Sequence, residues 1–199
     1  MENPERALSE IRLMMERSSR FLSLSGVSGI LAGIYALIGV GIFYFWLSPF
    51  SSNQQPISQG LIWKSLILAM VVLILAVATA GWMSQKKSRK ESLKFWAPAS
   101  RRFMQALFLP VISGGLFALA LLHVGQYNLI PSATLIFYGL GLISAGHFTM
   151  NEIKHLGIYQ LICGLFAAFF PEFGLVFWAL GFGVLHIVYG GMMYYRYER

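Results

Sequence analysis

The sequence contains no aspartate, since its eight acidic residues are all glutamates, and it contains one cysteine, Cys163. A single cysteine excludes an intrachain disulfide and a thiolate metal cluster within one chain. The apolar runs carry no paired carboxylates, and there is no Walker or Rossmann glycine loop. No polar stretch is long enough to form a domain that could hold a soluble substrate. These absences favour a non-enzymatic protein, and we expect no cofactor.

Charge is scarce, because 12% of the residues are charged while 57% are hydrophobic. A soluble domain of 199 residues could not bury so much apolar surface. Helices rising about 1.5 Å per residue cross a membrane in runs of about 20 apolar residues. Six such runs lie at 24–47, 60–83, 103–125, 131–150, 155–171 and 173–195. None alternates as a barrel strand would. The sequence therefore predicts an all-α membrane protein with one six-helix domain over 24–199.

Lysine and arginine fall on alternate connections between these runs. The connections 48–59, 126–130 and 171–174 contain neither residue. Because positive charge is retained on the cytoplasmic side during insertion, we expect both termini to be cytoplasmic. Lys64 breaks the pattern, but its stem can snorkel outward from the second run.

Two segments outside the runs are expected to meet the membrane surface. The pattern of Leu8, Ile11, Met15 and Leu22 predicts an amphipathic helix over 1–23, which lies on the surface or packs on a second copy. The connection 85–102 is strongly basic, and we expect anionic lipid headgroups as its partner. Its basic residues are Lys86, Lys87, Arg89, Lys90, Lys94, Arg101 and Arg102. This topology accounts for the net charge of +7, so no nucleic-acid partner is expected.

Short motifs recur in successive pairs of runs. The odd runs contain AGIYA from Ala32, GGLFA from Gly114 and CGLFA from Cys163, and the even runs end on TAGWMSQKKS from Thr79, SAGHFTMNEIK from Ser144 and YGGMMYYRYER from Tyr189. The sequence thus predicts three helical hairpins as pseudo-repeats. Glycine stripes in SGVSGILAG and GLGLISAG are expected to face other helices, and they also allow a homo-oligomer.

His186 is the best single candidate for a functional residue, since it lies deeper in its run than any other ionisable side chain. A charged or unpaired imidazole there is costly, so it should be neutral and point toward a hydroxyl or an amide. Candidate partners are Tyr138, Tyr159 and Gln160 on other helices and Tyr189 on its own. Both a hydrogen-bonded core histidine and a proton-coupled or ligand-binding residue remain open.

The stretch GHFTMNEIKH is expected to be an interfacial helix end followed by a turn at NEIKH. His147, Asn151 and His155 would instead share a face if the helix continued, and with Glu152 they could hold a divalent metal. A haem between His147 and His186 is disfavoured, because their depths differ by about 9 Å.

Pieces of the rhomboid protease pattern are present as GVSG at 26–29, HFTMN at 147–151 and His186, but in the wrong order. A small-residue packing face explains GVSG better.

The stretch EIRLMMERSSRFLSLSGVSGILAGIYAL resembles a group of uncharacterised bacterial six-span membrane proteins that share the SRFLSLSG beginning of the first helix. The resemblance covers about the first quarter of the chain. It implies the bacterial inner membrane and supplies no activity or site residue.

Two classes of function follow. The first is a non-enzymatic small transporter, channel or membrane partner subunit. The second is a membrane protein or enzyme that uses its histidines to hold haem or a metal.

Overall fold

The computed structural model describes residues 24–47, 59–90 and 98–199. The expected helix over 1–23 and Lys94 lie outside them. The described ranges contain helices and no strand, which confirms the prediction of an all-α protein. In chain order the elements are α2 (Gly26–Ile42), η1 (Phe43–Leu47), α3 (Gln59–Lys90), α4 (Pro98–His123), η3 (Tyr127–Leu129), α5 (Ile130–Ala145), η4 (Gly146–Phe148), α6 (Asn151–Phe169), η5 (Pro171–Phe173), α7 (Gly174–Trp178), η6 (Ala179–Leu185) and α8 (His186–Tyr197).

Five helices in the described ranges are long and apolar enough to cross a membrane: Gly26–Phe45, Gln59–Lys90, Pro98–His123, Tyr127–Phe148 and Pro171–Tyr197. The remaining long helix, α6, has 19 residues and begins with the polar stretch Asn151 to His155. These polar residues lower its apolar content, so the structure supports five of the six expected spans. An all-helical chain of this kind is compatible with a membrane protein.

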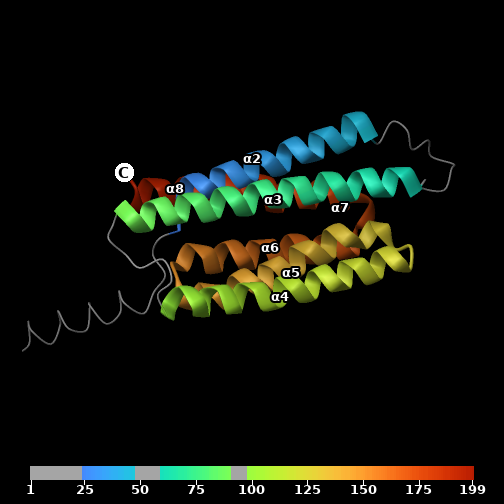
Figure 1. Cartoon of the computed structure of the whole chain (residues 1–199). Coiled ribbons are helices and arrows are strands. Elements are labelled where there is room, and N and C mark those ends of the chain that lie inside the picture. Colours follow the sequence, from blue (N-terminus) through green and yellow to red (C-terminus); the bar gives the residue numbers. More distant parts are fainter. Residues whose placement is uncertain (1–23, 48–58, 91–97) are drawn as a thin grey trace, which may run out of the picture.

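The helices form two groups (Figure 1). In one group α2 packs against α3 and α8, and in the other α5 packs against α4 and α6. The segment from α7 to α8 joins the groups, because η6 and α8 pack on α2 while α7 and η6 pack on α6. The flanking helices α3 and α4 expose large apolar side chains such as Trp63, Met70, Leu109 and Leu116. This surface suits contact with lipid chains.

Glycines allow the closest helix contacts. A Cβ atom built on Gly33 would lie 2.6 Å from the Gly183 carbonyl oxygen, and one on Gly139 would lie 2.7 Å from the Leu161 nitrogen. Only glycine permits such an approach of two backbones. The prediction that these stripes face other helices is confirmed. Close contacts join α2 to α8 and α5 to α6, which belong to different expected hairpins, and also α4 to α5 within one hairpin, so the threefold repeat stays a prediction.

The connection between α5 and α6 differs from the expected one. Helix α5 passes into the short η4 turn, Thr149 and Met150 are extended, and α6 begins at Asn151. The predicted turn at NEIKH is therefore wrong, since these residues form the first turns of α6. Glu152 suits this position, because a carboxylate is favourable near the positive end of a helix.

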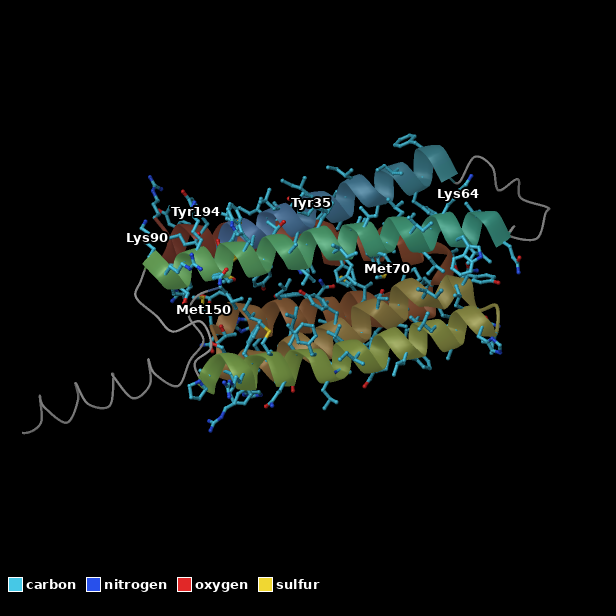
Figure 2. All side chains as sticks on the ribbon, in the orientation of Figure 1. Tyr35, Lys64, Met70, Lys90, Met150 and Tyr194 are labelled. Atoms are coloured by element: carbon cyan, nitrogen blue, oxygen red, sulfur yellow. The ribbon has the colours of Figure 1, made fainter. Side chains whose placement is uncertain are left out.

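The basic ends of the helices gather at one end of the molecule. Lys90 and Tyr194 lie at this end, whereas Lys64 lies at the opposite end (Figure 2). This arrangement matches the alternation of basic connections in the sequence.

Residues at and after the end of α8 contact other helices at the basic end of the molecule. The Glu198 carboxylate accepts hydrogen bonds from the Gly26 backbone nitrogen at 2.7 Å and from Lys87 Nζ at 3.2 Å. It therefore caps the first turn of α2, where α2 has no capping side chain of its own. Arg196 donates to Glu152 at 2.8 Å, which joins the end of α8 to the start of α6.

Candidate functional site

His186 lies where the π-helical segment η6 passes into α8. A π-helix is wider than an α-helix and is common at functional sites. The segment reads ALGFGVL, and its two glycines are buried against other helices. A Cβ atom on Gly181 would lie 2.5 Å from Gln160 Oε1, so only glycine allows α6 to approach this closely.

Three groups surround the His186 imidazole. Nε2 lies 3.1 Å from the Tyr138 hydroxyl on α5. Nδ1 lies 3.1 Å from the Gly181 carbonyl oxygen on η6 and 3.3 Å from Gln160 Nε2 on α6. The Gln160 amide also donates to the Gly181 carbonyl at 3.0 Å. Residues from α5, α6 and η6 thus meet at one imidazole.

These contacts assign the hydrogens of a neutral ring. A carbonyl oxygen only accepts, so Nδ1 carries the hydrogen and donates to the Gly181 carbonyl. Nε2 then accepts from the Tyr138 hydroxyl. Both ring nitrogens of His186 are satisfied by protein groups, and the side chain is buried. The expected contact with a hydroxyl is present, whereas the Gln160 amide donates to the Gly181 carbonyl beside the ring and not to the ring itself.

Aromatic rings enclose the imidazole. The Tyr138 ring lies 5.6 Å from it with an interplanar angle of 23°, and the Phe182 ring lies 5.8 Å away at 16°. The Trp178 ring lies 4.8 Å from that of Phe182. The imidazole is therefore stacked with its neighbours and not merely held at its edge.

One polar atom in the cluster has no hydrogen-bond partner among the described residues. Gln160 is fully buried, and its Oε1 meets no N–H or O–H donor. Leaving such an acceptor unsatisfied costs about 1–3 kcal/mol. The cluster therefore holds more acceptors than a neutral imidazole uses.

Tyr159 and Tyr189, the other two expected partners, pair with each other. Their ring centroids lie 6.2 Å apart. Tyr189 lies one turn after His186 on α8, and Tyr159 lies on α6. Tyr159 is half exposed. The structure thus brings together three of the five candidate residues and places the remaining two beside them.

The second expected group is dispersed. His147, Asn151 and His155 are all exposed, and Glu152 is buried and bound to Arg196 and the Tyr197 hydroxyl. In the part of the chain that the structure describes, no three His, Cys, Asp or Glu side chains could hold one metal ion. The interfacial helix end stays a prediction.

The serine of GVSG has a local partner. The Ser28 hydroxyl donates to the Ser25 carbonyl oxygen at 2.7 Å. Both nitrogens of His186 are occupied by other groups, so no Ser–His pair forms between these residues. GVSG instead supplies Gly26 and Gly29 to the contact with α8.

The basic residues expected at lipid headgroups divide into two kinds. Lys87 turns inward to Glu198 and to the Leu24 carbonyl, at 3.2 and 3.0 Å. The rest of those described are exposed, namely Lys86, Arg89, Lys90, Arg101 and Arg102.

Sequence reasoning missed the Gly181 carbonyl, Phe182 and the Glu198 cap. The spacing of glycines in ALGFGVL is the one signal that could have directed attention to η6.

The fold and the cluster define a class, an all-helical protein compatible with a membrane and carrying a buried histidine between three elements. No protein-family model, curated protein or solved structure matches the chain.

Proposed function

We propose that the protein is a small non-enzymatic transporter of the bacterial inner membrane and that the His186 cluster is its intramembrane polar site. One observation carries the proposal: a buried imidazole contacts Tyr138 of α5, Gln160 of α6 and the Gly181 carbonyl of η6. Polar side chains are expensive inside a membrane, and they mark substrate and ion pathways there.

The irregular backbone beside His186 supports the same function. Transporter sites commonly lie where a spanning helix departs from α-geometry and presents backbone carbonyls to the site. In this chain η6 interrupts the span from Pro171 to Tyr197, and its Gly181 carbonyl enters the cluster. A change in how α7 and α8 meet at η6 would therefore alter the His186 contacts directly.

Six spans with both termini in the cytoplasm are part of the proposal. Helix α6 is about 28 Å long at 1.5 Å per residue, close to the hydrocarbon thickness. It packs along α5. The exposed basic residues near the ends of α3 and α4 would then contact anionic headgroups on the cytoplasmic face.

A membrane partner subunit is the second candidate function, and α3 is the observation that favours it. None of its most apolar stretch is buried, and it packs mainly on α2. A helix attached on one side can receive another membrane protein, including a second copy.

Charge movement in proteoliposomes tests the transporter. Vesicles on a solid-supported membrane would receive jumps of sodium, potassium, methylammonium, acetate or glycine, and a pH step. We expect a transient current for at least one of these, reduced about tenfold or more by His186→Phe, which removes two hydrogen bonds but keeps the ring volume.

The matched control is His147→Phe, which makes the same change at an exposed histidine and should leave the current unaltered. Absence of any current from the whole panel in the wild type would overturn the transporter and favour the partner subunit.

A further inference from the structure

We infer that His186 is a reversible proton-binding site, in which the imidazole takes up a proton on Nε2 while the Tyr138 hydroxyl changes from donor to acceptor. The inference rests on the proposed transporter function, because it names the coupling ion as a proton. It requires a site that can hold both the neutral and the charged ring.

The hydrogen-bond geometry accommodates both forms. A neutral imidazole needs one acceptor and one donor, whereas an imidazolium needs two acceptors. The Gly181 carbonyl accepts from Nδ1 in either form. The Tyr138 hydroxyl, 3.1 Å from Nε2, can donate to a neutral ring or accept from a charged one after rotation about its C–O bond. Both ring nitrogens thus keep a hydrogen-bond partner in either form.

The proton balance is simple. One proton from water forms the Nε2–H bond, Tyr138 keeps its own proton, and the cluster gains one positive charge. The rotated hydroxyl hydrogen needs an acceptor of its own, and Gln160 Oε1 does not supply it, because that oxygen has no donor within hydrogen-bond distance among the described residues.

The aromatic shell also favours a cation. The faces of Tyr138 and Phe182 lie nearly parallel to the imidazole, with both centroids within 6 Å. An aromatic face at this distance attracts a positive charge, and the attraction grows when water is absent.

Few titratable groups surround the site. Helix α5 presents Tyr138, η6 presents none, and α2 presents glycines. Helix α6 carries Cys163 in the adjoining apolar cluster with Phe182, and α8 carries Tyr189, which pairs with Tyr159. None of these groups faces the ring as an anion. No described anion thus compensates the positive charge of the imidazolium. We therefore expect uptake or release of the proton to accompany opening of the site or entry of another solute.

Histidine-selective ¹⁵N NMR of the full chain in lipid nanodiscs tests the inference. The sequence has four histidines, and the His186 signal is identified by its loss in His186→Phe. At about pH 9 we expect the neutral ring with hydrogen on Nδ1, and between about pH 8 and pH 4 we expect conversion to the imidazolium.

Tyr138→Phe removes the acceptor at Nε2 and should lower the midpoint of this conversion by about one pH unit. Tyr159→Phe removes a hydroxyl outside the cluster and should leave the midpoint unchanged. A His186 ring that stays neutral down to about pH 4, or a midpoint that moves equally in both tyrosine variants, overturns the inference.

Replacing the exposed His123, His147 and His155 leaves His186 as the one histidine, so its signal is also identified where His186→Phe fails to fold. If a current is measured but His186 does not titrate, the protein is a transporter that uses another ion. If His186 titrates but no current is measured, the protein has a proton-binding site and is not a transporter.

Discussion

Replacing Gly33 by alanine probes the contact that joins α2 to α8. The new methyl group would lie 2.6 Å from the Gly183 carbonyl oxygen, 2.7 Å from Ile187 Cγ1 and 3.0 Å from the Ile187 nitrogen. Two of these three atoms belong to the backbone, so a rotamer change cannot relieve the clash. Helix α8 or η6 must move away from α2.

The size of the effect follows from these distances. Ordinary van der Waals contact begins at 3.4 Å, so the helices must separate by roughly 0.8 Å at this point. Overpacking of this kind costs about 1–3 kcal/mol. The better helix propensity of alanine returns about 0.5–1 kcal/mol. The difference spans about 0–2.5 kcal/mol, and its midpoint, a net loss of about 1 kcal/mol, should lower the melting temperature by about 2–4 °C.

The assay is thermal unfolding in one detergent, followed by far-UV circular dichroism. Gly41→Ala is the matched control, because it lies in the same helix and a Cβ atom there meets nothing within 4 Å. This control should melt at or slightly above the wild-type temperature. If Gly33→Ala melts with the control, the close α2–α8 contact does not stabilise the protein and the packing argument fails.

Three further predictions concern the ends of the helices. Lys87→Met should lower the free energy of unfolding by about 1–3 kcal/mol in a denaturant titration, because it leaves the largely buried Glu198 carboxylate without its cation. The control Lys86→Met, at an exposed site, should change this free energy by less than about 0.5 kcal/mol. Single cysteines at Asn151 and Glu172, on a background without the native cysteine, should be labelled from opposite sides of the membrane; labelling of both from one side would refute α6 as a span. Arg102→Gln should reduce the number of phosphatidylglycerol molecules retained in native mass spectra, and equal retention would argue against a headgroup contact.

The sequence was sufficient for the architecture because apolar length and glycine spacing are properties of the chain itself. Gly33 and Gly139 signalled close contacts, and the structure has them. Polar residues at a helix start were harder to interpret. Asn151, Glu152 and Lys154 look like a loop by composition, yet they begin α6, since Glu152 is paired with Arg196 from α8. That partner is distant in the chain and has no local signal.

Part of the candidate site could likewise be predicted from the sequence, and part could not. The depth of His186 indicated that it must find a hydroxyl or an amide, and Tyr138 and Gln160 are such groups. The Gly181 carbonyl could not be predicted, because it becomes available only through the π-helical turn, whose formation depends on packing against α6. The stacking of Phe182 on the imidazole depends on the same turn.

The contact between α2 and α8 has a consequence for biogenesis. It joins the first described helix to the last, and the glycine face of α2 finds its partner only when α8 has been synthesised. Until then the small-residue face of α2 has no partner and its first turn has no cap, because Glu198 follows α8 in the chain. A nascent chain stalled before α8 would therefore be held together by the packing of α5 on α4 and α6 in one group and of α2 on α3 in the other. Such an intermediate exposes the glycine face of α2 that α8 covers in the folded chain.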